Sequence, residues 1–397
     1  MVRLEPFDGA IVDPRHAAAV IAPPYDRLDA DERRAAAAAR PDSFLRVLPA
    51  GTAGDADGAE LRANRTALDE LRRGGRFTPL PGPCLAVLRL DHADSRTVGV
   101  VGDIAVAAFA SGAIRTHEQV RPARVEQLVR YLEVVGTASS PIALVHRDDT
   151  DTAAASAAVM RRADPDLDVT LDDDVRLRVW LVDDEVAQDE LRRAFAQVAG
   201  LTIADGHHRV AAAAAFAAAH GPGRAADRLL VAAFPASGLT VGAFDRRIVG
   251  AEATTHVLAV LAAAGITPTP IAPPTTRPSR HVAQLGMDRR WWSVPLHDVL
   301  TEGPLGRIDA AVVERILLTP LAARVPAVVV EPVPAAAAGS GEVPSTPDPG
   351  TALVRLHPPD VDTLIGAAMA GATLPAKSTY LGPKLRSGVF LVPRRPG

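Results

Sequence analysis

The sequence predicts an α+β protein with a mixed sheet. Apolar segments rich in β-branched residues indicate strands, and segments with apolar residues every three or four positions indicate helices. The two kinds interleave without strict alternation along 397 residues, and an α/β fold is the alternative. This length accommodates two or three domains. We expect an N-terminal α/β portion over 1–95, a central core over 96–250, and a C-terminal α/β portion over 251–397 that carries a Lys-Ser-Thr-Tyr segment.

Each expected element follows from a local pattern. The clearest helix spans 124–135, where Val125, Leu128, Val129 and Leu132 have helical spacing, and Gly136 ends it. Further helices are expected over 30–39 (with Asp26 as its cap), 61–71, 185–199 and from the corner near 206 to Gly221. Strands are expected over 84–90, 97–106, 140–145, 175–182, 201–204, 229–234 and 239–244. Connectors are expected over 267–278 and 332–350.

Composition narrows the functional classes. A net charge of −4 without a basic cluster predicts no nucleic-acid partner. The single cysteine, Cys84, excludes an internal disulfide framework and thiolate zinc sites, and its apolar neighbours predict that it is buried. No apolar leader or membrane-length apolar run occurs, so we expect a cytoplasmic protein without a membrane partner that acts on a small-molecule substrate. Homo-oligomerisation remains open.

A predicted strand ends at an Asp-Gly corner, and an alanine-rich helix follows at once. Asp205 is a preferred N-cap residue, expected to accept hydrogen bonds from the amides of His207 and His208. Gly206 permits a tight turn and the close approach of another molecule. The two histidines and Arg209 crowd the positive end of the helix dipole, where acidic residues are usual. The corner therefore predicts an anion site, above all for phosphate, with ordinary helix capping as the alternative.

The chain contains only two lysines, Lys377 and Lys384, both in one short segment. A compact ammonium contacts phosphate as a point charge, which a planar guanidinium does not. We therefore expect both lysines, together with the neighbouring Ser378 and Thr379, to contribute to phosphate binding. Ordinary solvated lysines are the alternative.

Other chemistries fit the sequence less well. The side chains of adjacent helical histidines diverge by about 100°, so His207 and His208 do not form a metal-binding pair. A magnesium ion carried by a nucleotide, with Asp205 as ligand, fits better. No Gly-x-Ser-x-Gly elbow, P-loop or protein-kinase motif set occurs. Phosphoryl transfer needs a carboxylate that accepts a hydroxyl proton; Glu118, after His117, is the candidate, with a surface carboxylate as the alternative.

Several motifs occur in a characteristic order. They are Ala22-Pro-Pro-Tyr-Asp26, His117-Glu118, Ser140-Pro-Ile142, Ile203-Ala-Asp-Gly-His-His-Arg209, and Pro375-Ala-Lys-Ser-Thr-Tyr380 with Pro383-Lys384. In these motifs the chain resembles the bacterial and archaeal family of domain of unknown function 1015. The sequence departs from the family pattern at Val120, in the helix at Glu126-Gln-Leu128, at Ala243-Phe-Asp-Arg246 and at Ala376.

The resemblance implies a ParB/sulfiredoxin-like nucleotide-binding core. Free-serine kinases of that superfamily are similar at the corner and phosphorylate serine with ATP or ADP. By this resemblance Glu118 is the base. In the site that we expect from the residues, His117 or His208 stabilises developing charge. The amides of residues 206–208 and Arg209 grip phosphate, Asp205 caps the corner and holds magnesium, and Lys377 closes over the site.

The expected function is therefore that of a small-molecule kinase that transfers phosphate from ATP or ADP to free serine or a related hydroxy amino acid. A ParB-like nucleotide switch without turnover is one alternative, and a phosphatase is another, because a phosphate cradle serves hydrolysis equally well.

Overall fold

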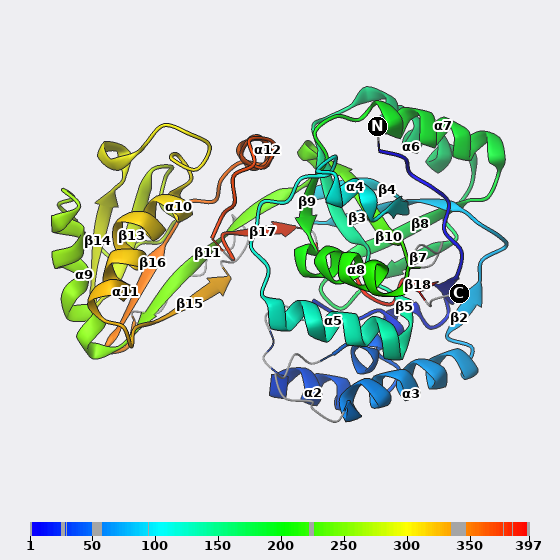
Figure 1. Cartoon of the computed structure of the whole chain (residues 1–397), viewed down its shortest axis with the longest axis horizontal. Helices are drawn as coiled ribbons and strands as arrows, with labels where there is room; N and C mark the ends of the chain where they lie inside the picture. Colours follow the sequence, from blue (N-terminus) through cyan, green and yellow to red (C-terminus); the bar gives the residue numbers. More distant parts are fainter. Residues whose placement is uncertain are drawn as a thin grey trace. The chain divides into compact units, whose positions relative to one another are not determined.

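The computed structural model describes residues 2–24, 28, 30–49, 58–93, 95–221, 226–334, 347–375, 377–382 and 384–394. It contains helices and both mixed and antiparallel sheets, which confirms the α+β class (Figure 1). The contacts divide the chain into two units. The first comprises Met1–Thr116, Val120–Leu239 and Pro383–Gly397, and the second comprises His117–Gln119 and Thr240–Gly382.

These units differ from the three consecutive portions expected from the sequence. The expected boundary at residues 95 and 96 falls inside a strand that pairs with its predecessor, so one sheet continues across it. The end of the chain returns to the first unit rather than staying with the C-terminal portion, because its last strand pairs with an N-terminal one. Asp26, expected to cap a helix, lies outside the described residues, as do Tyr25, Ala376 and Pro383.

The main sheet of the first unit has seven strands in the order β7-β8-β3-β4-β10-β6-β9. Only β10 and β6 run parallel among its neighbouring pairs, so the sheet is mixed. Its strands are β3 (Leu85–His92), β4 (Ser95–Ala105), β6 (Ile142–His146), β7 (Leu167–Thr170), β8 (Arg176–Val182), β9 (Thr202–Asp205) and β10 (Arg228–Pro235).

A second, four-stranded sheet in this unit joins distant parts of the chain. Its order is β2-β1-β18-β5, so the C-terminal strand lies between N-terminal and central strands. The members are β1 (Ala10–Val12), β2 (Phe77–Pro79), β5 (Thr137–Ala138) and β18 (Phe390–Pro393). This pairing carries the last described residues of the chain back to the segment that precedes β6.

The helices of the first unit cover these sheets. The predicted amphipathic helix is α5 (Pro122–Val135), which ends at Gly136 with φ 68° as expected, and it packs against α3 and α8 (Figure 1). It begins two residues earlier than predicted because proline is well tolerated in the first helical turn. The others are α1 (Ala17–Val20), α2 (Ala30–Ala39), α3 (Ala59–Arg73), α4 (Ala107–Ala110), α6 (Thr150–Arg162), α7 (Glu185–Gln197) and α8 (His207–His220).

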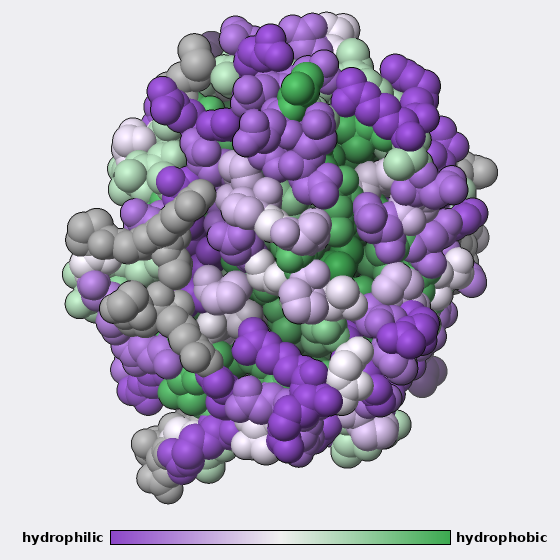
Figure 2. Space-filling view, turned by 90° about the vertical axis from the view of Figure 1, so that its right-hand side faces the viewer, coloured by the Kyte–Doolittle hydropathy of each residue, from purple (hydrophilic) through white to green (hydrophobic). Residues whose placement is uncertain are grey.

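The core of the first unit lies between the seven-stranded sheet and its helices and includes Leu85, Val100, Trp180 and Leu191. Cys84 is fully buried, as predicted. One face of the molecule is mostly hydrophilic, with a band of hydrophobic surface running through it (Figure 2). Among the described residues, no helix combines the length and the hydrophobicity needed to span a bilayer.

The second unit contains an antiparallel sheet in the order β12-β14-β13-β16-β11-β15, with β17 pairing to the start of β11. The predicted connector over 267–278 holds a short edge strand, β12, and the one over 332–350 begins inside β15. The elements are β11 (Thr240–Val249), α9 (Ala251–Ala263), β12 (Thr269–Ile271), β13 (Val282–Met287), β14 (Arg290–Pro295), α10 (Asp309–Val313), α11 (Thr319–Arg324), β15 (Val329–Pro334), β16 (Thr351–Arg355), α12 (Val361–Met369) and β17 (Thr379–Gly382).

Candidate functional site

The predicted corner forms between β9 and α8. β9 ends at Asp205, and α8 begins at His207. Gly206, which has no side chain to cap the helix, is the N-cap residue. The prediction that Asp205 is the N-cap residue is therefore wrong. Its carboxylate instead binds two cations, because charge-assisted hydrogen bonds are stronger than those from neutral amides.

Asp205 is the centre of a small ion cluster. Nζ of Lys384 lies 2.9 Å from its Oδ1, and Nη2 of Arg209 lies 2.6 Å from its Oδ2. Burial alone would raise the pKa of the Asp205 carboxyl, but the charges of Lys384 and Arg209 outweigh this and hold the pKa well below its usual range. The carboxylate is therefore ionised at neutral pH.

Arg209 also forms hydrogen bonds to the segment before β6. Its Nη1 donates to the carbonyl of Ser140 at 2.6 Å and to the carbonyl of Pro141 at 2.9 Å. These bonds join the Ser-Pro-Ile motif to the first turn of α8. In this structure Arg209 thus holds the corner together through protein contacts, whereas the sequence predicted a direct grip on phosphate.

Gly206 is required by the shape of the corner. Its φ of 107° and ψ of 22° lie in the left-handed region, which side-chain-bearing residues rarely adopt. A Cβ atom there would lie 2.8 Å from Cδ1 of Ile142 and 3.0 Å from Nη2 of Arg209. Glycine therefore allows the chain to turn from β9 into α8 without displacing the ion cluster.

The two histidines of the corner have different surroundings. His207 is buried. The Nε2 atom of His208 accepts a hydrogen bond from the backbone amide of Arg121 at 3.0 Å, so this nitrogen carries no proton. In this arrangement His208 holds the segment that leads into α5 and is a neutral imidazole.

Lys384 reaches the corner because the end of the chain is anchored beside β6. The Ser387 hydroxyl is hydrogen-bonded to that of Ser140, and the amide of Gly388 donates to the carbonyl of Ser139 at 3.2 Å. β18 then pairs with β5. The Lys384 side chain is only 14% exposed. The sequence predicted a role for this lysine but held no signal for its contact with Asp205.

A second group of predicted residues gathers in the second unit. The amide of Leu374 donates to the carbonyl of His117 at 2.7 Å, and Glu118 pairs with Leu374 in a β-bridge. The amide of Lys377 lies 3.5 Å from Oε1 of Glu118. Lys377 has a φ of 57°, a strained value for a residue with a side chain. The structure thus brings Glu118 and Lys377 together.

Two residues that the sequence reasoning missed support this group. The guanidinium of Arg246, on β11, is buried and donates to the carbonyl of Lys377 at 2.9 Å. The Lys377 ammonium lies 5.5 Å from the centre of the Phe244 ring, a cation–π distance. The sequence marked Phe244 and Arg246 only through the departure from the family pattern at residues 243–246.

The remaining predicted residues of this unit have local roles. The Ser378 hydroxyl donates to the carbonyl of Pro375 at 2.6 Å. Thr379 begins β17 opposite Ala243. His117 is buried, and burial lowers the pKa of its imidazole to about 4. His117 is therefore a neutral imidazole at neutral pH.

The described residues contain no group of three or more His, Cys, Asp or Glu side chains placed to hold a metal ion. Both carboxylate oxygens of Asp205 already contact cationic side chains. The corner therefore does not resemble a dedicated magnesium site.

Comparisons with known proteins show which family model and which solved structures the chain resembles. No curated protein matches the chain. Among solved structures, it is similar to SbnI with a C-terminal truncation from Staphylococcus aureus, at 12% identity and a TM-score of 0.44, covering 74% of this chain and 87% of that one. It is similar to a free serine kinase in complex with AMP, at 12% identity and a TM-score of 0.38, covering 74% and 91%. It is also similar to a conserved hypothetical protein from Pyrococcus furiosus, at 13% identity and a TM-score of 0.35; the match covers 72% of this chain and 93% of that one. The family model described as "Protein of unknown function (DUF1015)" matches residues 4–311, and the chain belongs to this family.

Proposed function

We propose that the β9–α8 corner binds the phosphate groups of ATP or ADP, and that the protein is a small-molecule kinase that phosphorylates free serine or a related hydroxy amino acid. The observation that carries the proposal is the pairing of Lys384 and Arg209 with one carboxylate at the start of α8. This arrangement places two cationic side chains at the positive end of a helix dipole.

The first turn of α8 favours an anion for a further reason. Gly206, the N-cap residue, has no side chain that could accept hydrogen bonds from the first amides of the helix. Cations at a helix N-terminus destabilise it unless anions offset them. A phosphate group adds negative charge at this position and is a common ligand of helix N-termini.

The division of roles follows from the contacts. Lys384 supplies the charge that attracts phosphate, while Arg209 maintains the backbone of the corner through the carbonyls of Ser140 and Pro141. In this proposal magnesium arrives with the nucleotide, because magnesium is usually bound by one or two carboxylates together with substrate phosphates.

In the proposed reaction the acceptor hydroxyl oxygen forms a bond to the transferred phosphorus, and the bond to the departing nucleotide oxygen breaks. The hydroxyl proton moves to a carboxylate, and the resemblance to free-serine kinases assigns this role to Glu118. The contact of Glu118 with the Lys377 amide supports a fixed orientation for that carboxylate.

Incubation of the full chain with ATP or ADP and a mixture of hydroxy amino acids, followed by phosphorus NMR, tests the proposal. A new phosphoester signal is expected, and Glu118→Gln should abolish it without changing the affinity for ADP. Lys384→Met should weaken ADP binding at least tenfold, whereas Arg130→Gln, which removes an exposed ion pair on α5, should not.

The same experiment separates the alternatives. Release of inorganic phosphate without a new ester would indicate a phosphatase, and binding without any reaction would indicate a nucleotide switch. Failure of the wild-type protein to bind either nucleotide would refute the corner as a phosphate site.

A further inference from the structure

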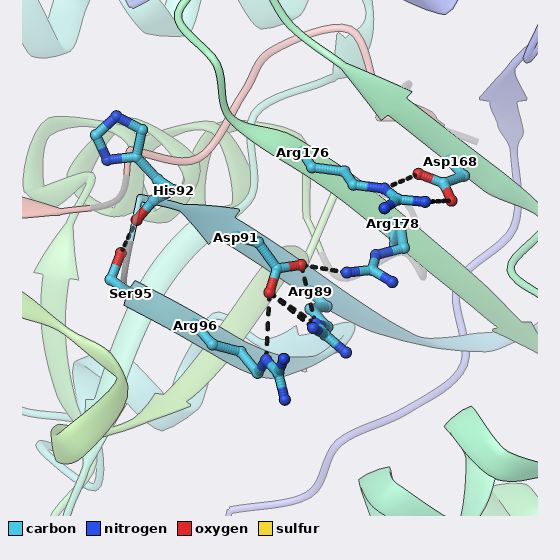
Figure 3. Close-up of polar contacts among 8 residues, drawn as sticks. All are labelled: Arg89, Asp91, His92, Ser95, Arg96, Asp168, Arg176 and Arg178. Atoms are coloured by element: carbon cyan, nitrogen blue, oxygen red, sulfur yellow. Dashed lines mark hydrogen bonds and ion pairs between the residues drawn. The ribbon is translucent and has the colours of Figure 1, made fainter.

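Away from the corner, six charged residues form a compact cluster on the seven-stranded sheet of the first unit (Figure 3). Strand register places them in two neighbouring cross-strand rows, since residues two apart on a strand share a face. One row holds Asp168, Arg178 and Arg89, and the next holds Arg176, Asp91 and Arg96. We refer to these six residues as the arginine face.

Asp91 organises the arginine face. Its carboxylate accepts hydrogen bonds from Arg89 at 2.8 and 2.9 Å, from Nε of Arg96 at 3.3 Å, and from Arg178. Figure 3 shows the guanidinium groups of these three arginines gathered around it. One carboxylate is therefore shared by three guanidiniums. Burial alone would raise its pKa, but the hydrogen bonds and charges of Arg89 and Arg178 outweigh this and lower it.

Arg176 does not share Asp91. It forms a two-pronged pair with Asp168, with Nε at 2.8 Å from Oδ1 and Nη2 at 2.6 Å from Oδ2. The whole face thus contains four guanidiniums and two carboxylates, which leaves two positive charges in excess. Like charges opposite each other on neighbouring strands are destabilising, and Arg89 and Arg178 stand in that relation.

Several guanidinium donors of the face have no protein acceptor within the described part of the chain. Arg96 uses only Nε, Arg89 does not use Nη1, and Arg178 uses only Nη2. Nε of Arg178 is buried and without a hydrogen-bond partner among these residues. The side chains of Arg89 and Arg178 are only 17% and 18% exposed, so water screens their charges incompletely.

We propose that the arginine face is a second anion site, which binds a phosphate group either as inorganic phosphate or as a phosphomonoester. A phosphate dianion matches the excess of two positive charges. Its oxygens also fit the two Nη groups of Arg96, which bind phosphate in two-pronged fashion, and the unused Nη1 of Arg89. None of the residues of the β9–α8 corner belongs to this face, so the site does not depend on the proposed kinase activity.

Calorimetric titration of full-length Lys384→Met protein with inorganic phosphate at low ionic strength tests the proposal, because this background weakens the corner. Arg96→Gln should lower the remaining phosphate affinity at least tenfold. The Arg96 side chain is 66% exposed, so its loss leaves the core intact. Arg130→Gln on α5, where the arginine is 52% exposed, is the matched control and should leave the affinity unchanged.

Parallel titrations with glycerol phosphate and with succinate identify the ligand class. Tighter binding of glycerol phosphate than of inorganic phosphate would assign the site to a phosphomonoester, and the reverse order to free phosphate. Equal binding of succinate would overturn the assignment to phosphate. No phosphate binding in the Lys384→Met protein, or equal affinity with and without Arg96, would overturn the site itself and leave the proposed function of the corner untouched.

Discussion

Replacing Lys384 by methionine is the most direct test of the ion cluster at the corner. Methionine keeps the length and much of the apolar stem of lysine but removes the ammonium that lies 2.9 Å from Asp205. Exposed ion pairs contribute about 0.2–1 kcal/mol, and breaking a buried pair costs about 3–5 kcal/mol. The two side chains are 14% and 38% exposed, so the pair lies between these cases. We expect a loss of about 1–2 kcal/mol at pH 7, with Arg209 still neutralising part of the carboxylate charge.

Hydrogen exchange followed by mass spectrometry measures this loss locally, which suits a chain of two units better than a single global transition. Peptides covering β9 and the first turn of α8 should exchange roughly 5–30 times faster in Lys384→Met. Peptides of the second unit should be unaffected. Arg130→Met, which breaks a solvent-exposed pair with Glu126, should change protection by about 0.5 kcal/mol or less.

The pH dependence provides an independent check. The pKa of Asp205 is lowered in the folded protein, so its stabilising contribution is complete above the pKa of about 3.9 in the unfolded chain and is lost as pH falls toward the folded value. The stability difference between wild type and Lys384→Met should therefore be constant from about pH 8 to 5 and narrow below about pH 4. Unchanged exchange at the corner, or a difference that grows in acid, would refute this account of the cluster.

Three further changes probe the same architecture. Asp205→Asn leaves two cations at the start of α8, so thermal stability should fall while calorimetric affinity for inorganic phosphate rises roughly tenfold; weaker phosphate binding would contradict the electrostatic argument. Gly206→Ala forces a Cβ toward Ile142 at positive φ and should cost about 1–3 kcal/mol in chemical unfolding, and a neutral result would show that the corner relaxes freely. His117 has a pKa of about 4 in the folded protein, so its contribution to stability is complete above about pH 6.5 and is lost as pH falls toward 4. Between pH 7.5 and 4.5 this loss lowers the free energy of unfolding by about 2–3 kcal/mol. His117→Gln should remove that part of the pH dependence, as measured by thermal unfolding at the two pH values.

Local patterns predicted the elements that form the corner. The spacing of apolar residues and the terminal glycine predicted α5, and the change from an apolar run to an alanine-rich run at the Asp-Gly pair predicted β9 and α8. Each of these signals lies within one element, where backbone geometry alone decides which side chains share a face. Such elements are therefore predictable from a single sequence.

The contacts that give the corner its charge were not predictable in this way. Asp205 was expected to cap α8 because the capping preference is local, but a lysine 179 residues further along the chain provides a stronger partner. The proline-containing segment 269–271 was expected to be a connector, yet it forms β12 at the edge of its sheet, where a proline that lacks an N–H donor is tolerated. In both cases tertiary pairing overrides the local preference.

The geometry of the corner explains why one of the chain's two lysines stands at 384, although arginine supplies almost every other positive charge. Arg209 performs the task that needs a planar fork, since it binds the Asp205 carboxylate and two carbonyls at once. A second guanidinium on the same carboxylate would need more volume in a place where Lys384 is largely buried. An ammonium supplies the same charge as a compact point with donors in three directions, which suits both a carboxylate and a phosphate oxygen. Arginine at 209 therefore suits the several hydrogen bonds that hold the backbone of the corner, and lysine at 384 suits a point-charge contact with the proposed ligand.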